Sequence, residues 1–293
     1  MFAKLFGSLL GRHFIHISNP GHLVGTFNAH LRDAVVLFAD EAFYAGDKKH
    51  VSILKTLITE ETIQIEAKGI DAETHSNYVH LIMASNDAHV IPAGGDERRF
   101  CVLDVGRNHQ MDSDYFRALI RQMDEGGREA LLHHLLTYDL SGFNLFEVPQ
   151  TQALQEQKEL SFSPEEDWWY NKLLEGRLMT NGDNWPEEVA KEEVLEDFIE
   201  YTERFRISRR GNATALGKFL SRVCPGIVSR QKKGAFNRYN HKSGYTEIVE
   251  RRGYFYTMPT LKASRSVWND LYGKVDWPEE QPVQESLPVE QAF

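Results

Sequence analysis

The sequence predicts an α/β fold followed by a smaller α+β module. Short apolar runs at residues 35–38 and 79–84 are typical of buried parallel strands, and each ends in polar residues. Helical periodicity separates such runs in the first half of the chain, which indicates a mainly parallel sheet. After residue 186, two helical patterns precede two strand-like runs, an order typical of winged-helix modules.

The composition is that of an ordinary globular protein with one or two domains. The chain has 293 residues, of which 41% are hydrophobic and 26% are charged. No run approaches the roughly 18 apolar residues of a membrane-spanning helix. The two cysteines, Cys101 and Cys224, lie far apart, and no Cys/His set has zinc spacing. We therefore expect a cytoplasmic protein with no membrane partner and with both thiols in the core.

Positive charge is concentrated in one block of the chain. Residues 204–265 contain 15 Lys and Arg and two Glu, whereas the rest contains 18 Lys and Arg and 41 acidic residues. A basic block inside an acidic chain predicts a surface that binds a polyanion. The alternative is a solvated basic face. We favour nucleic acid because aromatic residues lie in the same block.

The first elements are predicted to be a helix, a strand and a second helix, at residues 2–10, 13–17 and 23–31. Gly11 is expected to cap the C-terminus of the first helix, but no N-cap residue precedes the start of that helix. Two explanations are open: the protein begins upstream of Met1, or this is a frayed N-terminal helix.

A helix and a hairpin are predicted after the strand at 35–38. Residues 48–59 have an amphipathic helical pattern, and residues 62–67 alternate as a strand. Lys68-Gly69 then lies at the tip of a hairpin that returns from Glu73. Beyond the strand at 79–84 we expect a further strand at 100–105 and a helix at 112–138 that breaks near Gly126-Gly127.

Four regions are expected along the chain: a core at 1–140, a helical connector at 141–185, the basic module at 186–275 and a disordered acidic tail at 276–293. The connector includes a helix at 167–178. The basic module has helices at 189–205 and 214–223, then strands at 245–249 and 254–258 around Arg251-Arg252-Gly253.

Three polar motifs in the core have a chemical interpretation. Asp40 and Glu41 end an apolar strand, where one acid can hold Mg²⁺ on a nucleotide and the next can orient the attacking water. Asn86 ends another strand and can hydrogen-bond a γ-phosphate. Arg98 and Arg99 can stabilise transition-state charge in a neighbouring subunit. Each motif alone is more often a solvent-exposed strand end, a turn or a surface ion pair. The interpretation therefore rests on the order of the three motifs along the chain.

In this order the motifs resemble the superfamily 3 helicase domain of phage and plasmid primase–helicases, in the poxvirus-like and phage primase-polymerase group. The resemblance covers residues 2–105 and rests on FADEA, LKTLITEETIQIEAKG, LIMASND and DERRF. It implies an AAA+-like P-loop NTPase core, ATP and Mg²⁺ as cofactors, and a homo-hexamer that moves on single-stranded DNA. It also implies a primase or polymerase domain upstream or in trans, and a host-cell cytoplasm if the source is a phage.

The same resemblance implies roles for individual residues. Asp40 (as the Mg²⁺ ligand) and Glu41 would form the Walker B element, Asn86 the sensor, and Arg98 or Arg99 the arginine finger. Lys68 and Gly69 would form a pore loop that touches DNA.

The phosphate-binding loop of such ATPases, G-x-x-x-x-G-K-[ST], does not occur in the sequence. By resemblance it should lie just upstream of Met1, so the core is expected to lack its first strand and this loop. We expect the chain alone to hydrolyse little ATP. The alternatives are a non-catalytic DNA-binding replication factor on a degenerate helicase scaffold and, more remotely, an AAA+ protein that loads or packages DNA.

The basic module is predicted to bind the DNA backbone with strong salt dependence. Aromatic residues at Phe236, Tyr239 and Tyr245 are candidates for stacking on bases. The candidate phosphate contacts are Arg209, Arg210, Arg230, Lys232, Lys233, Arg238, Lys242, Arg251 and Arg252.

Overall fold

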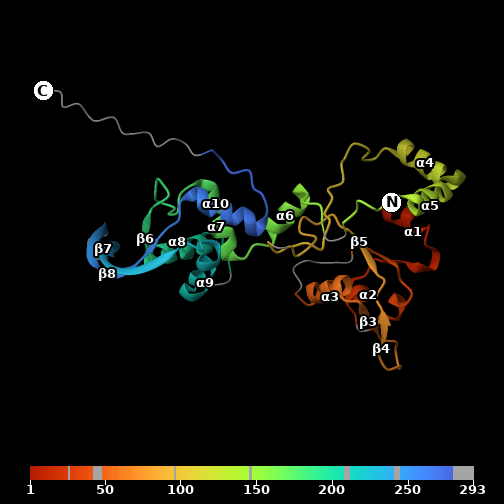
Figure 1. Cartoon of the computed structure of the whole chain (residues 1–293), viewed down its shortest axis with the longest axis horizontal. Coiled ribbons are helices and arrows are strands. Elements are labelled where there is room, and N and C mark those ends of the chain that lie inside the picture. The colour runs from red at the N-terminus through yellow and green to blue at the C-terminus, as the bar shows by residue number, and fades with distance from the viewer. Residues whose placement is uncertain are drawn as a thin grey trace. The chain divides into compact units, whose positions relative to one another are not determined.

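The computed structural model describes residues 1–25, 27–41, 48–95, 97–144, 147–207, 212–240 and 245–279. The chain forms two compact units, Met1–Ser161 and Phe162–Phe293 (Figure 1). Each unit has its own hydrophobic core. Among the described residues, no helix combines the length and the apolar character needed to cross a membrane.

A three-stranded parallel sheet organises the first unit. Its strands β1 (Phe14–Ile17), β2 (Val36–Asp40) and β5 (His80–Ala84) lie in the order β1-β2-β5. Four of the five residues of β2 are buried, as expected for a central parallel strand. The prediction of an α/β fold with a mainly parallel sheet is confirmed for this unit.

Helix α3 (Lys48–Thr59) occurs where it was predicted, whereas α1 (Phe2–Gly7) is shorter than the predicted 2–10. Ser8, not Gly11, is its C-cap, and Gly11 opens the 3-10 turn η1 (Gly11–His13). The helix expected at 23–31 is wrong: the structure has a short α2 (Pro20–Val24) and a separate 3-10 turn, η2 (Ala29–Leu31). Asn28 interrupts the helix, because its side chain bonds the backbone of Gln64 and Glu66 at 2.8 Å each. These bonds tie the loop to the neighbouring hairpin.

The predicted hairpin forms from β3 (Thr62–Ile65) and β4 (Glu73–Ser76), which pair antiparallel. Lys68 and Gly69 lie in its connection and are exposed. Gly69 has a φ of +80°, a conformation that favours glycine. The sequence therefore places these two residues correctly, while their contact with DNA stays a prediction.

The strand predicted at 100–105 is wrong, because these residues have no regular secondary structure and pair with no described strand. Phe100 lies in the core, whereas Leu103 and Val105 are 72% and 84% exposed. Cys101 is also exposed, which corrects the expectation that both thiols are buried; Cys224 is buried.

The long helix predicted at 112–138 breaks where it was expected to: α4 (Ser113–Gln122) and α5 (Arg128–Thr137) flank the π-helical turn η3 (Met123–Gly127), with Gly126 at a φ of +100°.

The boundary between the two units follows Ser161, which lies inside the connector expected at 141–185 and not at either of its ends. Helix α6 (Gln152–Leu160) belongs to the first unit, since Leu154 is buried in its core and Gln157 bonds the Ala88 carbonyl at 2.7 Å. Helix α7 (Pro164–Glu175) belongs to the second unit, where its tryptophans are fully buried. The polar composition of 141–166 hid the α6 contact, because few of its side chains face the core.

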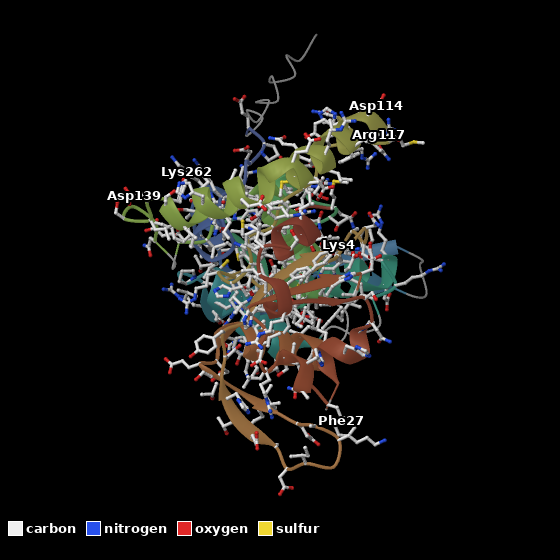
Figure 2. The ribbon with its side chains drawn as sticks, turned by 90° about the vertical axis from the view of Figure 1, so that its right-hand side faces the viewer. Lys4, Phe27, Asp114, Arg117, Asp139 and Lys262 are labelled. Carbon is white, nitrogen blue, oxygen red and sulfur yellow. The ribbon has the colours of Figure 1, made fainter. Side chains whose placement is uncertain are left out.

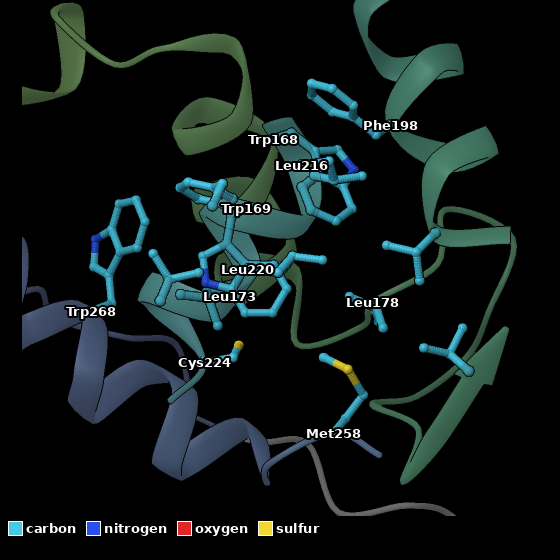
Figure 3. Packing of buried hydrophobic residues seen from close by; sticks show 14 of the residues in the cluster. Trp168, Trp169, Leu173, Leu178, Phe198, Leu216, Leu220, Cys224, Met258 and Trp268 are labelled. Carbon is cyan, nitrogen blue, oxygen red and sulfur yellow. The ribbon is translucent and has the colours of Figure 1, made fainter. Parts of the chain in front are cut away.

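The second unit contains α8 (Lys191–Arg204), α9 (Ala213–Val223) and α10 (Leu261–Tyr272) around a core of aromatic and aliphatic side chains (Figure 3). A short β6 (Glu188–Ala190) joins a long hairpin of β7 (Val228–Asn240) and β8 (Tyr245–Thr257) in the order β6-β8-β7. The predicted order of two helices followed by a hairpin is confirmed.

The hairpin itself differs from the prediction. The runs at 245–249 and 254–258 lie on one continuous strand, β8, and its partner is the basic stretch β7. Gly253 is not a turn residue: a Cβ there would lie 2.2 Å from the Phe236 ring, so this glycine makes room for an aromatic ring across the strand. Gly234 does the same for Phe255, at 2.3 Å.

Candidate functional site

The polar ends of two parallel strands meet at one edge of the first sheet. Asp40 and Ala84 are register partners, and the Glu41 amide donates to the Ala84 carbonyl at 2.9 Å. Asp40, Glu41 and Asn86 therefore lie together at the carboxyl ends of β2 and β5. Ligands of open α/β sheets bind at such an edge.

The Glu41 carboxylate is bound by the strand end beside it. It accepts hydrogen bonds from the Asn86 side-chain amide (2.8 Å), the Asn86 backbone N–H (3.0 Å) and the Ser85 hydroxyl (3.0 Å). Glu41 has a φ of +53°, a left-handed conformation that costs a non-glycine residue on the order of 1 kcal/mol or more. The backbone and three donors thus orient this carboxylate together. Ser85 is a site residue that the sequence did not identify by role.

Asp40 has different neighbours. Its Oδ2 lies 3.2 Å from His16 Nε2 and 3.6 Å from Lys4 Nζ, and its side chain is 36% exposed. The His16 ring stacks on Phe38 at 5.1 Å, which fixes it beside the strand end, while Lys4 extends from α1 (Figure 2). Sequence reasoning missed both Lys4 and His16, because neither has a motif spacing to Asp40.

The described residues contain no group of three or more His, Cys, Asp or Glu side chains placed to hold a metal ion. A single accessible carboxylate still fits Mg²⁺, which keeps several waters and is usually held by one or two carboxylates plus phosphate oxygens. Asp40 suits that role; a metal bound only by protein groups does not fit this site.

The two predicted arginines have unequal surroundings. Glu97 is 4% exposed, and its Oε1 accepts from the backbone N–H groups of Arg98 (3.0 Å) and Arg99 (2.8 Å). Its carboxylate also pairs with the Arg99 guanidinium at 3.3 Å. The Arg98 side chain is exposed and has no ion pair with any described residue. Among the described residues, neither arginine forms a hydrogen bond or an ion pair with Asp40, Glu41 or Asn86.

The basic residues of the second unit are divided between the two faces of the β7–β8 hairpin. Lys232 pairs with Glu188 and Arg251 with Glu192, on the face where their charged groups also lie over Phe255 (4.9 Å) and Phe236 (3.9 Å). Lys233 and Arg252 are register partners and share the opposite face. Acidic partners therefore neutralise both of the predicted phosphate contacts Lys232 and Arg251 on this face.

The outer face of the hairpin carries Lys233, Arg252 and Tyr254, all exposed. Lys233 also contacts Glu250 at 2.7 Å, whereas Arg252 has no ion-pair partner among the described residues. Arg230 has none either, but it is the register partner of Phe255 and lies on the face of Lys232. Tyr254 was missed from the sequence, and Phe236 is corrected: it is 3% exposed and packs in the core, so it has no free face for a base.

Several predicted contacts cannot be placed. Arg209, Arg210 and Lys242 lie outside the described residues, and for Arg238, Tyr239 and Tyr245 only the backbone is described.

A family model described as a family of unknown function (DUF5906) matches residues 1–99. Two apo structures of the NrS-1 C-terminal region, residues 305–718, are similar to the chain. They have 15% sequence identity, TM-scores of 0.55 and 0.53, and cover 87% and 85% of this chain. A third structure of this region has 14% identity and a TM-score of 0.56. The chain spans 64% and 62% of the length of the first two and 63% of the third. No curated protein was found to match. At this identity the likeness concerns the fold, a mixed α/β arrangement.

Proposed function

We propose that this chain carries the hydrolytic part of the ATP site of a replicative DNA helicase that moves on single-stranded DNA. The observation that carries the proposal is the Glu41 carboxylate held by Asn86 and Ser85, next to the accessible carboxylate of Asp40. The motif order resembles superfamily 3 helicases, and the fold likeness to the NrS-1 C-terminal region supports the same assignment. We propose an AAA+-like core and a winged-helix-like second unit.

Each carboxylate has a distinct role in this proposal. Asp40 holds the Mg²⁺ of bound ATP, and the ion neutralises charge on the phosphates. Glu41 orients and polarises the attacking water. Asn86, bonded to Glu41 at 2.8 Å, senses the γ-phosphate, since a phosphate oxygen that recruits its amide would release Glu41 toward the water.

The direct experiment expresses the chain together with the residues encoded in frame before Met1 and measures ATP hydrolysis with and without single-stranded DNA. Hydrolysis stimulated by DNA supports the helicase. A longer protein that contains a phosphate loop and still lacks ATPase activity counts against it.

The alternative is a non-catalytic DNA-binding replication factor. It is favoured by the contacts of the Asp40 carboxylate with Lys4 and His16, which lie where Mg²⁺ would bind. A stop codon close upstream of Met1, together with DNA binding and no ATP binding, would select it.

In a homo-hexamer, Arg98 acts on the ATP of the neighbouring subunit. We expect Arg98→Ala to lower DNA-stimulated hydrolysis by about 10³-fold or more, the usual contribution of an arginine finger. Arg99→Ala is expected to affect hydrolysis mainly by weakening the structure of the loop that contains Glu97, because the Arg99 side chain is bound to Glu97. Mixed rings provide the test: Arg98→Ala and Glu41→Gln subunits should regain activity together, since one interface type then has both groups. No recovery in mixtures that form rings would contradict the assignment.

DNA binding is proposed for the β3–β4 hairpin and for the outer face of β7–β8. We expect Arg252→Ala to reduce the salt slope of single-stranded DNA binding by about 0.7, the contribution of one phosphate contact. Lys232→Ala, the matched control, should change it less, because Lys232 is paired with Glu188. Fluorescence anisotropy over a salt series measures both. An Arg252→Ala slope equal to that of the unchanged chain would show that Arg252 does not contact a DNA phosphate.

A further inference from the structure

The candidate site residues Asn86 and Arg98 are joined by a segment without regular structure. Residues 86–99, of which all but residue 96 are described, form neither helix nor strand. Ile91 and Ala93, in the middle of this segment, are nevertheless buried in the core. Buried backbone N–H groups need acceptors, and no strand or helix of its own supplies them here. The segment therefore depends on partners from elsewhere in the unit.

Gln157 of helix α6 supplies three of these partners. Its side-chain oxygen accepts from the N–H groups of Val90 (2.7 Å) and Ile91 (3.2 Å). Its side-chain nitrogen donates to the Ala88 carbonyl at 2.7 Å. Gln157 is itself buried, so both ends of its amide are used inside the protein.

Ser161, one turn further along, continues the same contact. Its hydroxyl oxygen accepts from the Ala93 N–H at 3.0 Å and lies 3.0 Å from His89 Nε2. The hydroxyl donates to the Gln157 backbone carbonyl at 2.8 Å, which fixes its direction. The backbone from residue 88 to residue 93 is thus bound to one face of α6.

The start of α6 holds the chain beyond the arginines. The Thr151 hydroxyl donates to the Val102 carbonyl at 2.5 Å, and Leu154 is buried in the core of the unit. Residues 151, 154, 157 and 161 follow helical spacing and share one face. This face therefore binds the chain on both sides of Arg98.

Hydrogen bonds connect the bound segment to the site at both of its ends. At the first end, the Asp87 N–H donates to the Ser85 hydroxyl at 3.0 Å, and that hydroxyl donates to Glu41. At the other end, the Glu97 N–H donates to the Gly94 carbonyl at 3.0 Å. The Glu97 carboxylate then holds the Arg98 backbone, as described above.

We propose that Gln157 and Ser161 are positioning residues: by fixing residues 88–93, they set the place of Asn86 beside Glu41 and the place of Arg98. This inference rests on the function proposed above. A sensor that exchanges Glu41 for a γ-phosphate needs a fixed backbone, so that only its side chain moves. Asn86 is exposed and cannot obtain that rigidity from burial.

The test compares two glutamines of the same helix in the full chain. Gln157→Met keeps a side chain of similar length and removes its donor and its acceptor. Gln152→Met is the matched control, because Gln152 is exposed and its side-chain nitrogen donates to Glu156 on the same helix at 3.1 Å. Amide hydrogen exchange is followed by NMR in both variants.

Exchange at Val90 must rise in Gln157→Met, since its acceptor is removed. The informative amides are those of Asn86 and Asp87, whose own acceptors are left intact. We expect their exchange to accelerate by about tenfold, the upper range for one ordinary hydrogen bond. Val35, whose N–H donates to the His13 carbonyl in the sheet at 2.9 Å, should not change. Unchanged exchange at Asn86 and Asp87 would reduce Gln157 to a local structural role and overturn the proposal.

A second pair of variants decides the question if Gln157→Met does not fold or also accelerates Val35. Ser161→Ala removes the acceptor of Ala93, whereas Ser161→Thr keeps the hydroxyl. Exchange at Asn86 should be faster in Ser161→Ala and close to the parent in Ser161→Thr. Equal exchange in these two variants contradicts the proposal.

Hydrolysis separates this inference from the proposed function. In the longer protein used to test ATPase activity, Gln157→Met should lower kcat by about tenfold and leave the KM for ATP unchanged. The reason is that Asp40, the proposed Mg²⁺ ligand, lies on β2 and not on the bound segment. An unchanged kcat would refute the positioning role. If the parent protein hydrolyses no ATP, the proposed function fails, and the exchange at Asn86 alone decides whether α6 positions this residue.

Discussion

Asp197→Ala is expected to destabilise the second unit by about 3–5 kcal/mol, the usual cost of removing one partner of a buried ion pair. The Asp197 carboxylate lies 2.7 Å from the Lys172 ammonium, and both side chains are under 5% exposed. It also accepts from the Trp168 indole (2.9 Å) and the Thr180 amide (2.6 Å). Among the described residues, the variant leaves the buried Lys172 ammonium with only the Thr180 hydroxyl as a hydrogen-bond partner.

Urea unfolding followed by tryptophan fluorescence measures this loss, since Trp168 and Trp169 are fully buried beside the pair. Asp183→Ala, at an exposed acid, should stay within about 0.5 kcal/mol. The double variant Lys172→Met/Asp197→Leu should recover much of the loss, because it removes both charges. A single variant as stable as the Asp183 control would show that the ion pair contributes nothing.

The same pair gives the unfolding free energy a pH dependence. Burial acts to raise the pKa of Asp197, but the bonds from Lys172, Trp168 and Thr180 outweigh it and hold that pKa below its usual value. A carboxyl with a lowered folded-state pKa stabilises the protein above its unfolded pKa of about 3.9. The stabilisation is lost as the pH falls through the folded pKa. Asp197→Ala should therefore flatten the acid limb of the stability curve.

The sequence predicted the strands β2 and β5 because a buried parallel strand is an apolar run with an abrupt polar end. The same signal located Asp40, Glu41 and Asn86, since the carboxyl ends of neighbouring parallel strands meet. Lys4 and His16 could not be found this way. They reach Asp40 from α1 and β1, and only the packed sheet brings those elements together.

Pattern reasoning failed where pairing decides the structure. Strand β7 has charged or polar side chains on both faces, so it shows no alternation and was left unassigned. Residues 100–105 have a strand pattern but no strand to pair with in the described chain. A strand-like pattern indicates only that a segment's side chains would fit a sheet. Whether the segment becomes a strand depends on a second segment that can form backbone hydrogen bonds with it, and the pattern gives no information about that segment.

Glu41→Gln is expected to lower the kcat for ATP by about 10²–10⁴-fold in a protein that carries the phosphate loop, the range for losing a positioned general base. The glutamine carbonyl can still accept from Asn86 at the position of Oε1, and its NH2 group, at the position of Oε2, can donate to the Ser85 hydroxyl oxygen, so the strand end should keep its geometry. What is lost is the negative charge that polarises the water. ATP affinity and the unfolding midpoint should change little, which separates catalysis from folding.

Two companion variants sharpen this test. Glu61→Gln, at an exposed acid that begins the β3–β4 hairpin, should leave kcat unchanged. Asn86→Ala keeps the Glu41 charge but removes its 2.8 Å donor, so it should lower kcat while leaving Mg²⁺-ATP bound through Asp40. A Glu41→Gln enzyme with the parent rate would exclude Glu41 as the group that activates water. The chemistry of this edge would then reside in Asp40, and the Glu41–Asn86 bond would serve only to shape the ends of β2 and β5.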